Sequence, residues 1–407
     1  MNSVAVFSQL FLGSLVVFHT ILLPRAYRYC ANGARLSSVQ PDIRDFLRPD
    51  PPHLLGCIQL PVLSPGATLS AGIVLSCSLI AALLAPGPVF ARTALAGAAI
   101  SSLIYFSQLR DFNFVRRKAN TIPVILLLLC LSPGICPGSS DATARWPILA
   151  AGIILVQVYL SAGIEKLRHE GFGWARGRVL QWALIDHELW SADNPRRLIT
   201  SPGLIASASA IALIFELTVP LALTSPSVAA GYAVLGILFH LANSRLLRIH
   251  YHFIYPAYAA VPAFLIHDSS PWFDSSYGVV IVLALTGVLT VVTVTGRQWW
   301  PFDKYPMYAT APPGPNFAHR LELTDTNGTV RWWRTTISSD LERICQLLNR
   351  SARDGDTKPV IEAALLLSGT PVSSISHARV YRREFSPAGT LIQTPIWEQS
   401  FAATSIV

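Results

Sequence analysis

The chain has 407 residues, of which 52% are hydrophobic and 13% charged, and its mean hydropathy is +0.45. Soluble domains carry about 25% charged residues, so the composition argues against a soluble multidomain protein and for one that crosses a membrane several times. The net charge of +8 comes largely from loops between apolar segments, so we expect the lipid bilayer, and no nucleic acid, as a partner.

Apolar segments that approach the width of a bilayer recur through residues 1–299. The fourth and eighth are short or interrupted by proline, as in kinked or re-entrant segments. We therefore predict an all-α polytopic membrane bundle of about nine transmembrane helices, with an amphipathic helix at 177–190 lying in the membrane interface. The nine segments are 4–23, 67–86, 88–109, 121–137, 146–165, 203–224, 227–245, 251–267 and 276–295.

Lysine and arginine are distributed unevenly between the two sides of this bundle. The loops on one side carry 17 of them, whereas the other side has only Arg92 and Arg145 near its helix ends. By the positive-inside rule, the basic side faces the cytoplasm, and the C-terminal domain with it. The basic loops are 24–66, 110–120, 166–202 and 245–250.

Residues 300–407 have the alternating pattern and the turns of a small α+β extramembrane domain. A β-hairpin is predicted around a turn at Asn327-Gly328, and a helix capped by serine follows it. A second helix is predicted at about 359–369 and a further strand at 378–385.

The cysteines and histidines show no spacing typical of a metal site, so we expect no metal. His250 and His252 are two residues apart and therefore do not share a helical face. Cys30 and Cys57 lie in one loop and could form a disulfide in an oxidising compartment, which the sequence leaves open.

Ionisable side chains inside apolar helices cost about 2.5–3.5 kcal/mol for a central lysine or aspartate, and so mark functional candidates. At the end of the fifth segment, Tyr159, Ala162, Gly163 and Lys166 fall on one helical face. The small pair would let another helix or a flat ligand approach. Lys166, whose charged form is disfavoured by desolvation, would serve as a base. Alternatively, it only extends its ammonium group to the membrane interface.

The next two apolar segments carry further polar groups. Glu216 stands among apolar neighbours in the sixth, and His240, Asn243 and Ser244 form a polar stripe on the seventh. Together these groups predict a polar pocket inside the bundle. Glu216 could instead neutralise a basic neighbour, and the stripe could supply hydrogen bonds between helices.

Two motifs resemble those of the vitamin K-dependent γ-carboxylases. Residues 159–167, YLSAGIEKL, are similar to the family's Tyr-x-x-Ala-Gly-x-x-Lys-Leu, and residues 239–249, FHLANSRLLRI, to its Phe-His-x-x-Asn-Ser-x-Leu-x-x-Ile. A weaker third match follows in family order at 305–330. The wider group of horizontally transferred transmembrane domain proteins has bacterial members, so the resemblance places the chain in a bacterial inner membrane.

The resemblance implies a function for the first motif. In the carboxylases, the matching lysine is the base that acts on reduced vitamin K, whose reaction with oxygen drives removal of a γ-proton from a glutamyl residue and addition of CO2. Lys166 would then be the catalytic base for reduced vitamin K or a menaquinol-like quinol, with His240 and Asn243 lining the pocket. The carboxylases have an Asn-His pair that assists catalysis at the start of the preceding span, and Asn120 would occupy the corresponding position here. The substrate would be a peptide or a small carbon acid.

Three departures from the family pattern favour a non-catalytic alternative. The histidine next to Asn120 is missing, the acidic Glu165 precedes the lysine, and the region that binds the propeptide is reduced to residues 300–407. The alternative is a lipid-binding or partner-binding membrane scaffold of the same fold. A transporter is a third hypothesis, ranked last because the sequence shows no inverted repeat.

Overall fold

Contacts divide the chain into two compact units. The first comprises Met1–Cys30, Pro49–Trp174 and Ala210–Ala309, and the second Ala31–Arg48, Ala175–Ser209 and Thr310–Val407. The boundary expected near residue 300 stays a prediction, since two earlier segments group with the C-terminal residues. This structure is a computed structural model that describes residues 3–39, 53–54, 58–109, 121–132, 145–191, 201–246, 255–266, 272–273, 276–295, 298–299, 302–303, 317–333, 344, 347–348, 357–368, 370–385 and 391–401.

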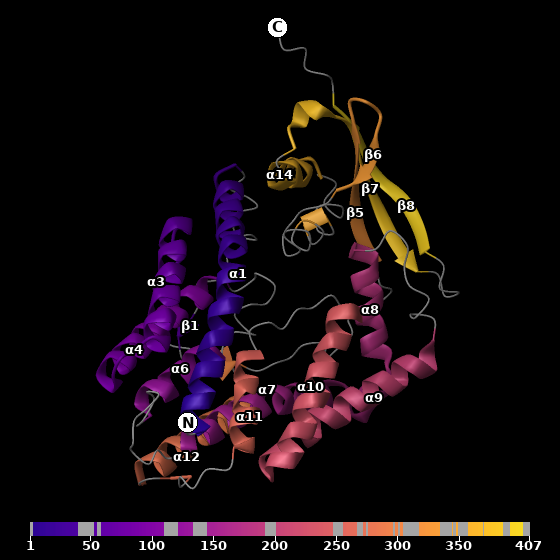
Figure 1. The fold of residues 1–407 in the computed structure, drawn as a ribbon. Helices are drawn as coiled ribbons and strands as arrows, with labels where there is room; N and C mark the ends of the chain where they lie inside the picture. The colour runs from indigo at the N-terminus through magenta and orange to yellow at the C-terminus, as the bar shows by residue number, and fades with distance from the viewer. Residues whose placement is uncertain are drawn as a thin grey trace. The chain divides into compact units, whose positions relative to one another are not determined.

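The described chain is mostly helical, and seven of its helices are long and apolar enough to cross a membrane. Figure 1 shows two of them, α3 and α4, packed side by side. The membrane bundle expected from hydropathy is therefore present in outline. The seven helices are α1 (Ser3–Val39), α3 (Pro65–Leu83), α4 (Pro88–Gln108), α7 (Trp146–Glu170), α9 (Pro202–Thr218), α10 (Pro226–Leu246) and α12 (Ser276–Thr295).

The fourth and eighth predicted segments form short helices. The fourth contributes α6 (Thr121–Leu131), and the eighth a 3₁₀ turn, η4 (Tyr255–Ala259), followed by α11 (Ala260–Leu265). Pro262 lies inside α11 and supplies no backbone N–H to it. The described part of each helix is too short to cross a bilayer, so the count of nine spans stays a prediction.

Helix α7 is the central element of the first unit. Burial covers 78% of its apolar window, against 17–44% for the other six candidate spans, and α6, α11 and α12 all contact it. Pro147 opens it in the first turn, where a missing N–H costs no hydrogen bond. Gly171, at a φ of 57°, ends it in a conformation that favours glycine. The next residues form a 3₁₀ helix, η1 (Gly171–Arg176).

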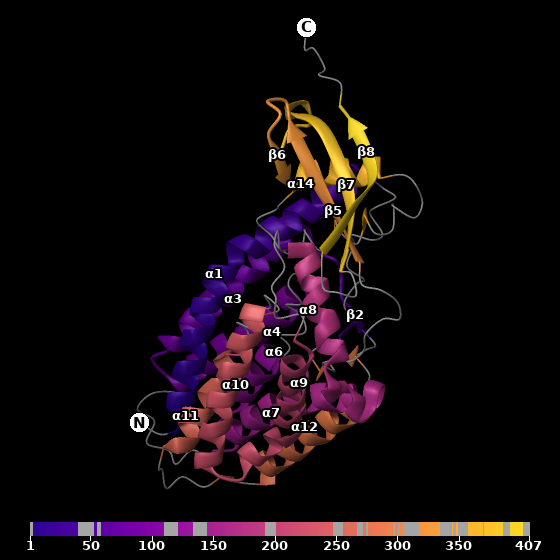
Figure 2. The same cartoon turned by 90° about the vertical axis from the view of Figure 1, so that its right-hand side faces the viewer.

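The second unit contains a four-stranded antiparallel sheet in the order β6-β5-β7-β8. Helix α14 (Lys358–Ser368) lies against one face of this sheet (Figure 2). The indole N–H of Trp333 donates to the carbonyl oxygen of Ala364 at 2.9 Å and joins the two. The strands are β5 (Phe317–Asp325), β6 (Val330–Trp332), β7 (Ile375–Phe385) and β8 (Leu391–Ser400).

The predicted hairpin joins β5 to β6. The Asp325 carboxylate accepts from the backbone N–H groups of Asn327 and Thr329, both at 2.9 Å, and Gly328 has a φ of 80°. These contacts close the turn because glycine adopts a positive φ without strain. The hairpin, the second helix and strand β7 are confirmed, whereas β8 was not predicted.

Helix α8 (Arg178–Ser191) also belongs to the second unit. The structure packs it against β5 and β7, and its expected position in the membrane interface stays a prediction. An amphipathic helix can bury its apolar face on lipid or on protein. The periodicity of the sequence did not indicate whether the apolar face of α8 packs on lipid or on protein.

Candidate functional site

Lys166 and Glu216 form a buried ion pair between α7 and α9. The Lys166 Nζ lies 2.5 Å from Oε1 and 2.6 Å from Oε2 of Glu216. The two residues are 5% and 3% exposed, so this pair is shielded from water. Of the roles open to Glu216, the structure shows the neutralising one.

Gly163 explains how the two helices come close enough for this pair. A Cβ placed there would lie 3.1 Å from both the Cβ of Glu216 and the Cδ2 of Leu217. Such contacts are tighter than ordinary packing, so a side chain on Gly163 would push α9 away from α7. The small residue predicted to admit a helix or a ligand admits a helix.

The ammonium group of Lys166 has a second neighbouring residue, Trp174 in η1. Nζ lies 4.4 Å from the centroid of the indole ring, and Trp174 is 2% exposed. A cation over an indole face is attracted by the ring quadrupole. The Lys166 ammonium group therefore contacts both the Glu216 carboxylate and the Trp174 ring.

Glu165, the residue before the lysine, faces a different set of groups. Its carboxylate accepts from Arg168 at 2.5 Å and lies 3.4 Å from the ring of His169. Arg168 also donates to the carbonyl oxygens of Thr293 and Val294 at the end of α12, at 3.4 and 2.7 Å. Glu165 therefore supports the contact between α7 and α12 and is not the counter-ion of Lys166.

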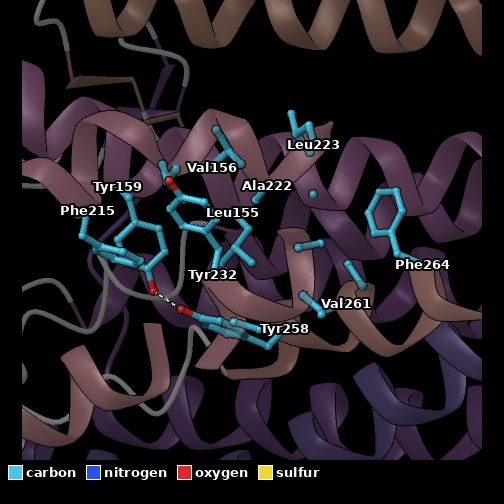
Figure 3. A pocket seen from close by; sticks show the side chains of 15 residues that line it. Leu155, Val156, Tyr159, Phe215, Ala222, Leu223, Tyr232, Tyr258, Val261 and Phe264 are labelled. Carbon is cyan, nitrogen blue, oxygen red and sulfur yellow. Dashed lines mark hydrogen bonds between the residues drawn. The ribbon is translucent and has the colours of Figure 1, made fainter. Parts of the chain in front are cut away.

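Tyr159, two turns before Lys166, joins a second polar cluster. Its hydroxyl lies 2.6 Å from Nε2 of His240 on α10 and is hydrogen-bonded to the hydroxyl of Tyr258 in η4. The dashed line in Figure 3 marks the bond between the two tyrosines. The pairing of Tyr159 with His240 joins two of the predicted site residues, whereas Tyr258 was missed because nothing in its local pattern distinguishes it from an interfacial aromatic.

An apolar pocket opens beside this cluster (Figure 3). It encloses about 30 Å³, and Tyr159 and Tyr258 provide hydroxyl groups in its wall. Phe215 and Tyr232 stack within its lining at a centroid distance of 6.0 Å. These two aromatic residues were not predicted as site residues, because aromatic rings in apolar helices carry no distinguishing signal in the sequence. Its lining residues are Gly152, Leu155, Val156, Tyr159, Phe215, Val219, Ala222, Leu223, Ala229, Tyr232, Ala233, Tyr258, Ala260, Val261 and Phe264.

The remaining predicted residues are not brought into this pocket. Ala162, Asn243 and Ser244 are partly buried and lie outside its lining. The Ser244 hydroxyl donates to the carbonyl oxygen of Leu241, within its own helix, at 2.9 Å. Asn120 lies outside the described residues. Of the predicted polar stripe on α10, His240 is the residue that contacts the site, through its hydrogen bond with Tyr159.

Among the residues that the structure describes, no group of three His, Cys, Asp or Glu side chains could hold a metal ion. Cys30 has no disulfide partner among the residues that the structure describes, and Cys57, its suggested partner, lies outside them.

Fold and site together define a multi-pass membrane protein with a small sheet-containing unit and a buried Lys-Glu pair near an aromatic pocket. No family model, curated protein or solved structure matches the chain.

Proposed function

We propose that this membrane protein binds a quinol in the bundle of α7, α9 and α10, and that Lys166 acts as a base in oxygen-dependent chemistry on it. The observation that carries the proposal is the buried pair of Lys166 and Glu216, two helical turns from the bonded trio of Tyr159, His240 and Tyr258. Two turns of α-helix span about 11 Å, which is within reach of one bicyclic ring and its substituents. The reaction would be an epoxidation coupled to proton abstraction or carboxylation of a peptide or small carbon acid.

The ion pair supplies a route to the neutral amine. A proton that moves from Lys166 Nζ to the carboxylate along a 2.5 Å hydrogen bond would leave two uncharged groups. Low dielectric favours neutral groups over separated charges. Glu216 would then hold the proton while Lys166 serves as the base.

The chemistry of the pocket residues suits a quinol, whereas the volume of the pocket is smaller than a quinol ring needs. Phenol hydroxyls beside an apolar lining match a flat apolar ring with oxygen substituents. A cavity that holds benzene measures about 150 Å³, against about 30 Å³ here. Binding would therefore require pocket side chains such as Tyr232 and Phe264 to move apart. A bound quinol would supply the acidic hydroxyl on which the base acts.

A non-catalytic scaffold is the second candidate, and a specific contact favours it. Lys166 is held by both oxygens of Glu216 and by the ring of Trp174. A lysine with these three partners suits a structural role that joins α7 to α9. In this reading, the pocket would bind a lipid or a partner without chemistry.

We also propose that the basic loops and the C-terminal sheet face the cytoplasm of a bacterial cell. The support is the uneven distribution of lysine and arginine.

Quinol consumption distinguishes the enzyme from the scaffold. Purified protein in nanodiscs would receive reduced vitamin K or menaquinol with oxygen, and epoxide would be followed by mass spectrometry. We expect epoxide from the wild type and from Lys358→Ala, an exposed lysine in α14, and none from Lys166→Ala. Absence of epoxide from all three, with the proteins folded and quinone still bound, would establish the scaffold.

A further inference from the structure

Arg145 is a buried cation at the N-terminal end of α7, the end farther from Lys166. It is the N-cap residue of α7 and is 8% exposed. Its guanidinium lies 4.3 Å from the ring centroid of Trp272 and donates to the carbonyl oxygen of Ile266 at 3.4 Å. That long hydrogen bond is weak compensation for a buried charge.

Two buried donors at this end of α7 have no acceptor in the part of the chain that the structure describes. They are Nε of Arg145 and the indole Nε1 of Trp146, and Trp146 is 0% exposed. Arginine and tryptophan side chains can only donate. Within the same described ranges, no carboxylate pairs with Arg145. An anionic oxygen would supply the acceptor that these two donors lack.

Aromatic residues surround this end of α7. The candidate span begins at Trp146, directly after Arg145. Trp272 and Tyr277 are 38% and 47% exposed, and the ring of Tyr277 packs edge-on against Trp146 at 6.3 Å. Tryptophan and tyrosine gather at the membrane–water interface. We therefore expect Arg145 to lie at the depth of the lipid phosphates.

We infer that Arg145, Trp146 and Trp272 form a binding site for the phosphate of an anionic phospholipid. The guanidinium matches two phosphate oxygens with parallel N–H donors, and the indole of Trp146 adds a further donor. The positive end of the α7 dipole attracts the same charge. The acyl chains would extend along the apolar helices. This site is independent of the quinol proposal, because none of its residues lines the pocket.

Native mass spectrometry of the full-length protein in detergent tests the site. Phosphatidylglycerol would be titrated against the wild type, Arg145→Gln and Arg92→Gln, with phosphatidylcholine as the zwitterionic comparison. Arg92, the matched control, is the other arginine near this side and donates to the carbonyl oxygen of Ser132. We expect Arg145→Gln to weaken phosphatidylglycerol binding about tenfold or more, as the loss of a charged hydrogen bond predicts, and Arg92→Gln to bind as the wild type does.

Melting temperatures provide the second measurement. Phosphatidylglycerol should raise that of the wild type and leave that of Arg145→Gln unchanged, whereas inorganic phosphate should have no effect. Arg145→Lys keeps the charge but not the forked donor, so phosphatidylglycerol should raise its melting temperature by an intermediate amount. This variant keeps the test valid if Arg145→Gln fails to fold. Two outcomes would overturn the inference: equal phosphatidylglycerol binding by the wild type and Arg145→Gln, or equal stabilisation of the wild type by free phosphate.

Discussion

A lysine and a glutamate that are both shielded from water stabilise a fold only as a pair. Lys166 and Glu216 are 5% and 3% exposed, so removal of one leaves the other as an uncompensated charge. We expect Lys166→Met to cost about 3–5 kcal/mol of unfolding free energy, and Lys166→Met with Glu216→Leu to recover most of that loss. Denaturant titration of the single and double variants in detergent measures this. Additive losses would contradict the pair, and Lys358→Met is the control for loss of a lysine.

A glycine decides how close two helices come in this bundle. Gly163→Ala would place its Cβ 3.1 Å from Glu216 and Leu217, so we expect a loss of about 1–3 kcal/mol from overpacking. Gly231→Ala on α10, where nothing lies within 4 Å of the new Cβ, should be neutral or stabilising because alanine favours helix. Unfolding measurements on the two variants check the contrast. Equal changes in unfolding free energy for the two variants would mean that α9 moves to admit the new methyl group without loss of stability.

Strands β7 and β8 are joined by a charged contact that titrates. The hydrogen bond from Arg379 lowers the pKa of the Glu398 carboxyl below its ordinary value, and His377 lies 3.1 Å from the same carboxylate. A lowered pKa means that the contribution to stability is complete above the unfolded value of about 4.3 and is lost as pH falls through the folded value.

We therefore expect amide exchange in β7 and β8 to accelerate more below pH 4 in the wild type than in Glu398→Gln. Hydrogen exchange of the full chain, corrected for the intrinsic pH dependence, measures this. The same acid response in both proteins would show that the contact does not hold the strands together.

Membrane orientation is a property of the whole molecule. The loops 24–66, 110–120, 166–202 and 245–250 carry the excess of positive charge, and we expect them on the cytoplasmic side. Alkaline phosphatase fused after the C-terminal sheet should then be inactive, and a fusion after Arg92 should be active. High activity of the C-terminal fusion would contradict this orientation. It would also place the charged end of α7 outside the cytoplasm.

The sequence by itself determined the class of protein and several local elements. The hydropathy of a segment depends only on its own residues, so the apolar helices were predictable. The pair Asn327-Gly328 predicted the hairpin because a turn depends on adjacent residues. The prolines in the fourth and eighth segments predicted that α6 and α11 would be short or interrupted.

Only the tertiary structure decided which polar groups meet. Lys166 and Glu216 are 50 residues apart, and their contact depends on how α7 and α9 are rotated about their axes and how closely Gly163 lets them pack. The same holds for Glu165, which turns to Arg168 and away from its neighbour Lys166, and for Tyr258, which joins Tyr159. Sequence spacing places residues on a helical face, but the packing of distant helices selects their partners, because that packing is set by the summed contacts of many side chains.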